Sequence, residues 1–200
     1  MKKIFLTIFV SGAVFLASFV FYFVFFQSGV NSGLDQITAK AFAFYDQSQV
    51  NSSGAPVRLK IPKIGVDAAV EYAGITKDGI VGVPKGPVNV AWFNQSAIPG
   101  APGVAVIDGH AGWHDGIPAV FDDLYKLKVG DKVYVDAKDG TVTTFIVREM
   151  KKYDPKADAS VLFNSTDGLA HLNLVTCAGV WNPAEKTHTQ RLVVFTDKQI

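Results

Sequence analysis

Hydrophobic and polar positions alternate with a period of two through much of the chain beyond residue 56. The alternating runs are short, rich in β-branched residues and separated by Gly, Pro, Asp and Asn, as strands usually are. An Asp139-Gly140 pair between two runs is a hairpin signal. We expect strands at 57–61, 104–107, 132–135, 141–147, 172–176 and 192–195. Helical patterning is confined to 119–127 and a turn near 157–163, so a mainly β domain is predicted, a closed barrel or a sandwich with short helices.

The first 26 residues have a different pattern. Lys2 and Lys3 precede 4–26, a run of 23 residues without charge. As a helix this run would be roughly 35 Å long, enough to cross the ~30 Å hydrocarbon layer of a membrane. The lysines favour a cytoplasmic N-terminus. We therefore expect residues 1–26 to form a cytoplasmic tip and one transmembrane anchor, with the rest of the chain extracellular.

Two further segments follow the predicted anchor. Residues 27–56 are rich in Gln, Ser, Gly and Asn, which is typical of a stalk or linker. Residues 57–200 are long enough for one domain with its own core. That domain carries sixteen Lys and Arg against sixteen Asp and Glu and is therefore neutral. A neutral domain without basic clusters argues against a nucleic-acid partner.

The chain has a single cysteine, Cys177, at the end of a predicted strand. A lone thiol forms no disulfide within the chain, which leaves a buried structural cysteine, a link to another chain, or a nucleophile. A nucleophilic thiol needs a rigid mount and a nearby base or cation that favours the thiolate. A strand end followed by Ala178-Gly179 provides such a mount.

Two other residues could complete a nucleophilic site. His110 follows Gly109 at a second strand-to-loop junction, and an imidazole can take a proton from a thiol and return it to a leaving amine. Asp108 could orient that ring, or be a solvated or turn-capping carboxylate. Arg191 opens a third apolar run, where a guanidinium could hold a carbonyl or an oxyanion.

A metal site is the rival interpretation. His110 and His114 are four residues apart, a spacing that binds zinc when both lie on one helix. Gly109 and Gly112 make a helix improbable there. We therefore expect neither a metal nor another cofactor.

Several segments, taken together, resemble one protein family, the sortases. The run 173–177, Asn-Leu-Val-Thr-Cys, resembles the sortase signature Thr-Leu-x-Thr-Cys. Asp108-Gly109-His110 resembles the family's Gly-His, and 191–194 resembles the strand that carries its arginine. The resemblance covers about 57–197, and 59–67 looks like the family's opening strand. Further segments look most like class F sortases, with classes D and E also open: 83–93, 99–103, 119–121 and 127–131.

The resemblance implies an eight-stranded sortase barrel and a membrane-anchored cysteine transpeptidase. Cys177 would cleave a Leu-Pro-x-Thr-Gly-like sorting signal between Thr and Gly through a thioester, and a cell-wall amine would then resolve the thioester. His110 would be the general acid and base, and Arg191 would stabilise the oxyanion. The partners would be secreted proteins with a C-terminal sorting signal and an amine acceptor in cell-wall peptide. The residues expected to bind substrate are Thr176, Trp181 and Trp113.

The chain departs from the family pattern in two places. Asn173 replaces the first threonine of the signature, and the residues after His110 differ from the usual class F continuation. Two alternatives stay open: a sortase-like peptide-binding scaffold with little catalysis, and a metal-dependent hydrolase that uses His110 and His114.

Overall fold

The computed structural model describes residues 54–77, 79–185 and 187–200, which hold eight strands and four single-turn 3-10 helices. The strands are β1 (Pro56–Ile61), β2 (Val66–Ala73), β3 (Val90–Phe93), β4 (Gly103–Gly109), β5 (Lys132–Ala137), β6 (Val142–Tyr153), β7 (Ala170–Asn182) and β8 (Thr187–Lys198). The helices are η1 (Pro62–Ile64), η2 (His114–Gly116), η3 (Leu124–Lys126) and η4 (Ala159–Leu162).

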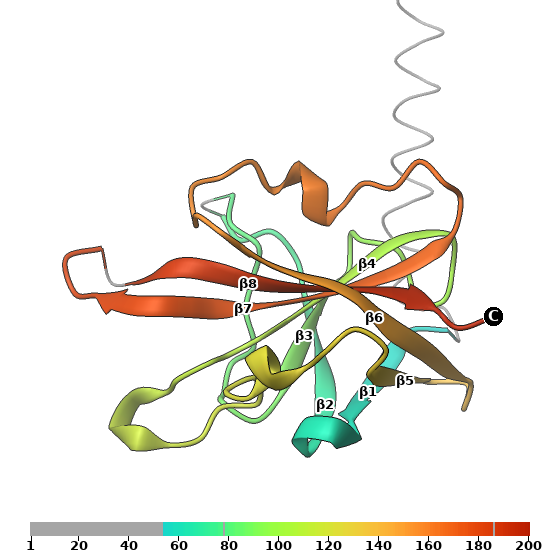
Figure 1. Cartoon of the computed structure of the whole chain (residues 1–200), viewed down its shortest axis with the longest axis horizontal. Coiled ribbons are helices and arrows are strands. Elements are labelled where there is room, and N and C mark those ends of the chain that lie inside the picture. Colours follow the sequence, from blue (N-terminus) through green and yellow to red (C-terminus); the bar gives the residue numbers. More distant parts are fainter. Residues whose placement is uncertain (1–53, 78, 186) are drawn as a thin grey trace, which may run out of the picture. The chain divides into compact units, whose positions relative to one another are not determined.

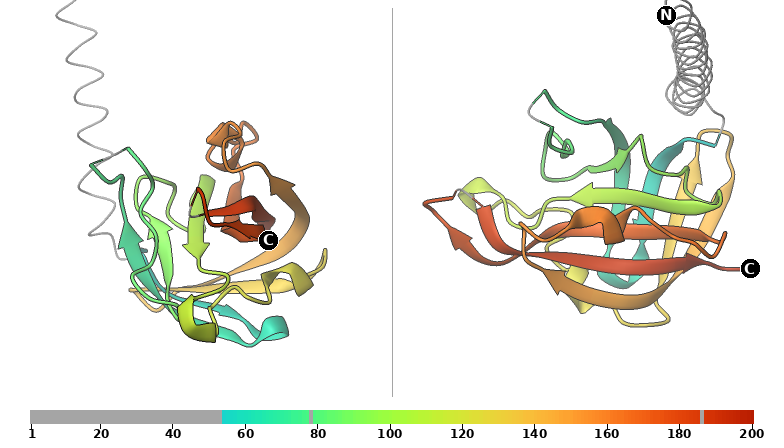
Figure 2. Two further views of the ribbon diagram at one scale, coloured as in Figure 1. Left: turned by 90° about the vertical axis from the view of Figure 1, so that its left-hand side faces the viewer. Right: turned by 90° about the horizontal axis from the view of Figure 1, so that it is seen from above.

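The eight strands close into a barrel in the order β1-β2-β3-β4-β7-β8-β6-β5, with β5 pairing back to β1 (Figures 1 and 2). Two of the neighbouring strand pairs are parallel, β2 with β3 and β4 with β7, and the other pairs are antiparallel. Closure gives each of these strands two neighbours within the barrel. The expected mainly β fold is confirmed, and the barrel prevails over the sandwich.

Alternation along each strand separates the interior of the barrel from its outer face. On β7, Leu172 and Leu174 are fully buried in the main core, whereas Asn173 between them lies on the outer face, where the β6–β7 connection covers it. The interior is filled mainly by large apolar side chains, and Trp92 is fully buried there with its indole N–H donating to the carbonyl of Ala97, 3.1 Å away. A rigid interior therefore backs the outer face of β7.

The connection between β6 and β7, residues 154–169, lies over part of that outer face and contains η4 (Figure 1). Asn173 donates from its amide nitrogen to the carbonyl of Leu162 at 2.9 Å, and Phe163 packs edge-on against Phe93. His171 lies between two carboxylates, with Nδ1 2.7 Å from Asp197 and Nε2 3.0 Å from Asp167. These contacts fix the connection to the barrel.

Several boundaries differ from the expectations. β2 and β3 had no clear alternating signal, because β2 is diluted by alanines and all four residues of β3 are buried. The helix expected over 119–127 is only the single turn η3. Its backbone donors have distant partners instead: the N–H of Val120 bonds the carbonyl of Pro87, and that of Phe121 bonds the carbonyl of His110.

Residues 180–190, which lie between the strands expected at 172–176 and 192–195, are largely strand. Trp181 pairs with His188 and Asn182 with Thr187, so β7 and β8 form a hairpin that extends beyond the barrel (Figure 1). The predicted membrane anchor and almost all of the predicted stalk lie outside the described residues. Within the described part of the chain, no helix has the length and apolar character needed to cross a membrane.

Candidate active site

The predicted nucleophile and the predicted arginine face each other across one antiparallel pair. Cys177 of β7 is in register with Arg191 of β8, so the two side chains leave the same face of the sheet. This is the outer face, because Thr176 and its partner Leu192 point into the barrel. The hairpin therefore brings together two residues that are 14 positions apart in the sequence.

Gly179 lets the strand continue past the nucleophile. Its φ is 78°, a left-handed conformation that favours glycine, and the strand pairing shifts register between Ala178 and Trp181. A Cβ on Gly179 would lie 2.4 Å from Oγ1 of Thr189. The strand end expected at Cys177 is therefore a bulge within the hairpin, and β7 continues to Asn182.

The thiol of Cys177 is half-buried. Burial raises its pKa above the usual value, the charge of Arg191 opposes that shift, and the carboxyl of Asp108 adds to it. The thiol is therefore mainly protonated at neutral pH. Attack by its sulfur requires that a base remove the proton or that bound substrate change the surroundings.

His110 comes directly after β4, the strand beside β7. The parallel register pairs Asp108 with Val175, so continuing it by two residues brings His110 to the level of Cys177. A buried hydrogen bond ties the two strand ends together: the hydroxyl of Thr176 donates to the carbonyl of Gly109 at 2.6 Å. The residues just before the imidazole and just before the thiol are thus directly connected.

The ring of His110 is held on one side only. Its Nε2 lies 2.9 Å from the carbonyl oxygen of Pro84, which can only accept, so Nε2 carries the proton. The indole of Trp113 packs on the ring with centroids 4.7 Å apart. Nδ1 makes no hydrogen bond within the described ranges, and none joins His110 to Cys177. The nitrogen that remains free is the one that can accept a proton.

Gly109 is required by close packing. A Cβ there would lie 2.5 Å from Cδ2 of Phe121, whose ring is 1% exposed. The carbonyl of His110 also accepts from the N–H of Phe121 at 2.9 Å. The segment after the imidazole thus folds back on the strand end and fixes the backbone of His110.

The guanidinium of Arg191 is bound to its own strand. Nη1 donates to the carbonyls of His188 and Gln190 at 3.3 and 3.1 Å, and Nη2 donates to Oγ1 of Thr187 at 2.9 Å. Its Nε has no hydrogen bond among the described residues. The side chain is therefore fixed, with donor capacity left for a substrate oxygen.

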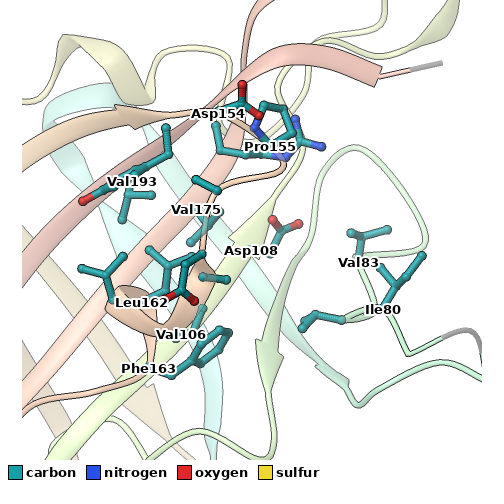
Figure 3. Close-up of a pocket in the computed structure, with 18 residues that line it drawn as sticks. Ile80, Val83, Val106, Asp108, Asp154, Pro155, Leu162, Phe163, Val175 and Val193 are labelled. Atoms are coloured by element: carbon teal, nitrogen blue, oxygen red, sulfur yellow. The ribbon is translucent and has the colours of Figure 1, made fainter. Parts of the chain in front are cut away.

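A mostly apolar groove lies on this face of the sheet (Figure 3), and Arg191 is among the residues that line it. It lies over the outer faces of β4, β7 and β8, between the segment 80–83 and the β6–β7 connection. Its apolar walls are formed by Ile80, Val81, Val83, Val106, Val161, Leu162, Phe163, Val175 and Val193. Cys177 itself lines a separate hollow beside it. Its register partner Arg191 is the residue of the pair that lines the apolar groove.

The groove also contains a carboxyl group that the sequence did not assign. Asp108 does not hydrogen-bond His110; it extends into the groove from β4 (Figure 3). Burial raises the pKa of this carboxyl to about 7, against the opposing charge of Arg191. The alternation of β4 and β7 was the signal that could have placed it on this face.

The residues expected to bind substrate lie in three different places. Thr176 is 2% exposed and bonded to Gly109, Trp113 packs on His110, and Trp181 is 51% exposed near the hairpin tip, edge-on to His188. None of the three lines the apolar groove. Their roles in binding stay predictions.

The rival metal arrangement gains no support from the described part of the chain. Nδ1 of His114 lies 2.8 Å from the carboxylate of Asp115, and both side chains are exposed. Within residues 54–77, 79–185 and 187–200, no three His, Cys, Asp or Glu side chains gather at metal-binding distances.

Comparisons with known proteins agree with the fold of the domain. Residues 59–199 match the family model of the sortase domain. Sortase C-1 from Actinomyces oris superposes with a TM-score of 0.58 at 22% identity, covering 80% of this chain and 81% of that one. Sortase C-1 from Streptococcus pneumoniae gives 0.54 at 27% identity, covering 72% and 66%.

A sortase D5 transpeptidase from Clostridium perfringens gives a TM-score of 0.54 at 24% identity, covering 73% of this chain and 79% of that one. These structures bear class C and D names, and the expected likeness to class F stays a prediction. No curated protein matches the chain. The family model covers most of the chain and supports a cysteine transpeptidase: the chain belongs to the sortase family.

Proposed function

We propose that this protein is a membrane-anchored transpeptidase that cleaves a Leu-Pro-x-Thr-Gly-like sorting signal between Thr and Gly and transfers the acyl part to a cell-surface amine. The observation that carries the proposal is the register pair of Cys177 and Arg191, whose arginine lines an apolar groove, with His110 following the neighbouring parallel strand. A pure peptide-binding scaffold needs the groove but neither the thiol nor the imidazole.

The first half-reaction forms a thioester. Sγ of Cys177 attacks the carbonyl carbon of the signal threonine, and the thiol proton passes to Nδ1 of His110, the ring nitrogen without a partner. The oxyanion that forms is stabilised by Arg191. The C–N bond to glycine then breaks, and His110 returns the proton to the leaving amine.

The second half-reaction consumes the thioester. A neutral primary amine attacks its carbonyl carbon, His110 takes a proton from the attacking nitrogen, and the C–S bond breaks. The thiolate recovers that proton, which restores Cys177 and the neutral imidazole. Because burial raises the pKa of the thiol, a proton acceptor beside Cys177 is needed for attack near neutral pH.

The test is product analysis by mass spectrometry. Purified full-length protein in detergent micelles is incubated with a panel of five-residue signals, with and without oligoglycine or diamino-acid amines. We expect cleavage after threonine and a new amide when an amine is present. Cys177→Ala and His110→Asn should abolish both products, whereas His114→Asn, a change at an exposed neighbouring imidazole, should not.

Two results would contradict the proposal. Activity that survives Cys177→Ala would exclude the thioester, and activity that is lost on adding a chelator would favour the metal-dependent hydrolase. For the anchor, we expect the protein to stay in the membrane fraction of cells and to lose that location when residues 1–26 are removed. Recovery of the intact protein in the soluble fraction would contradict this part.

A further inference from the structure

Asp108 is a half-buried carboxyl group inside the groove that the reaction above does not use. Val106, two residues earlier on β4, also lines the groove, and Val175 lies opposite in register. Figure 3 shows the carboxylate directed into the open space between the β7 side and Val83. It has no hydrogen bond to any described residue, so a donor on a bound ligand would be its first partner.

The other charged groups of the groove are already engaged. Asp154 accepts from the N–H of Lys156 at 2.7 Å. Asp158 accepts from the N–H and the hydroxyl of Ser160 at 2.9 and 2.7 Å, where it caps η4. Arg191 is bonded to its own strand. Of the carboxylates in the groove, Asp108 is the one whose side chain has no hydrogen bond to any described residue.

The strand register gives the position of Asp108 along a bound peptide. It is level with Val175, two residues from Cys177, which is about 7 Å along the strand. Consider a sorting signal in extended conformation with the carbonyl of its threonine at Cys177. The residue before that threonine then lies about half of this 7 Å from Cys177 along the strand. A lysine or arginine there is long enough to reach Asp108.

We propose that Asp108 is a specificity-determining residue that selects sorting signals with a lysine or arginine immediately before the threonine. This inference rests on the proposed function for the direction of the peptide. The apolar walls of the groove exclude water from the contact, which strengthens a charge-assisted hydrogen bond and penalises an acidic side chain at the same place.

The experiment measures binding before chemistry. Full-length Cys177→Ala protein in micelles is titrated with fluorescent Leu-Pro-Lys-Thr-Gly, Leu-Pro-Gln-Thr-Gly and Leu-Pro-Glu-Thr-Gly at pH 8, and anisotropy gives each Kd. We expect the lysine peptide to bind at least about tenfold more tightly than the glutamate peptide. Adding Asp108→Asn should reduce this ratio to about one.

Asp154→Asn is the matched control. It removes one charge from the same groove but keeps the side-chain oxygen that accepts from Lys156, so the peptide preference should persist. Asp108→Ala is the second variant, in case the amide of Asp108→Asn finds a partner of its own. An unchanged lysine-to-glutamate ratio in both Asp108 variants would overturn the inference.

Cleavage of the same peptides by protein with Cys177 intact separates the two proposals. A lysine preference that depends on Asp108, without Cys177-dependent cleavage, would support the inference and overturn the transpeptidase function. Cleavage that depends on Cys177 but is unchanged in the Asp108 variants would support the transpeptidase function and overturn the inference. Failure of all three peptides to bind would overturn both.

Discussion

The hydrogen bond between Thr176 and Gly109 connects the two halves of the candidate site, and replacing Thr176 by valine tests its importance. Valine has nearly the same shape but no hydroxyl. The bond is 2.6 Å long, the side chain is 2% exposed, and Gly109 is buried, so its carbonyl would lose a partner away from water. We expect the free energy of unfolding to fall by about 1–3 kcal/mol. For a domain of this size that is a decrease in Tm of about 3–10 °C.

The effect on catalysis should be disproportionate. Without the bond, the backbones that carry Cys177 and His110 can separate, and misplacement of a reacting group by about 1 Å can cost about a hundredfold in rate. We expect Thr176→Val to reduce kcat/KM for a fluorogenic sorting peptide at least about tenfold at a temperature where the variant is folded. Urea denaturation followed by circular dichroism gives its stability.

Thr176→Ser is the matched control. It keeps the hydroxyl but loses a methyl group from the barrel interior, which costs about 1 kcal/mol. The two variants should therefore lose similar stability, but only the valine variant should lose most of its activity. If serine and valine lower kcat/KM equally, or if valine leaves it unchanged, the bond does not position the pair and the reasoning fails.

Three further predictions follow from the same region. Gly109→Ala should lower the free energy of unfolding by about 1–3 kcal/mol, because its Cβ would overlap the ring of Phe121; an unchanged urea midpoint would contradict this. Alkylation of Cys177 by iodoacetamide should speed up with rising pH through and beyond the usual thiol range. At pH 8 it should be faster in Asp108→Asn and slower in Arg191→Met, because these charges shift the thiol pKa in opposite directions; equal rates would refute the assignment. The folded carboxyl of Asp108 has its pKa raised to about 7, so it keeps a proton that the unfolded chain releases between about pH 4 and 7. Its contribution to the free energy of unfolding therefore falls as pH rises through that window. Urea denaturation at pH 5 and pH 8 should show this loss of stability in the unmodified protein and a smaller loss in Asp108→Asn. An identical loss in the two proteins would contradict the prediction.

The sequence was informative where local pattern and tertiary structure agree. Alternation located most strands, and the Asp139-Gly140 signal lies in the turn between β5 and β6. Cys177 and Arg191 could be chosen because each stands at a recognisable place in an alternating run. Their registration depends on the hairpin, and the family resemblance anticipated it.

Non-local pairing explains what the sequence did not reveal. β3 is held by a parallel contact with β2 and an antiparallel contact with β4, and its four residues carry no alternation of their own. The backbone donors of Val120 and Phe121 have partners far away in sequence, which prevents the expected helix. The sequence predicts Asp108 as a partner of His110 or as a solvated or turn-capping carboxylate, because its place in the groove depends on which face of β4 the β6–β7 connection covers.

The parallel pairing of β4 with β7 explains why these chemical groups meet. In a parallel pair the two strands end at the same edge, so the residues that follow β4 are brought alongside the middle of the longer β7. The antiparallel partner β8 then adds Arg191 directly opposite Cys177. Alternation on the same two strands sends Asp108 and Val175 into the groove two residues earlier. The register that brings His110 level with Cys177 therefore also sets which part of a bound peptide would meet Asp108, so the proposed chemistry and the proposed selectivity of this site share one structural origin.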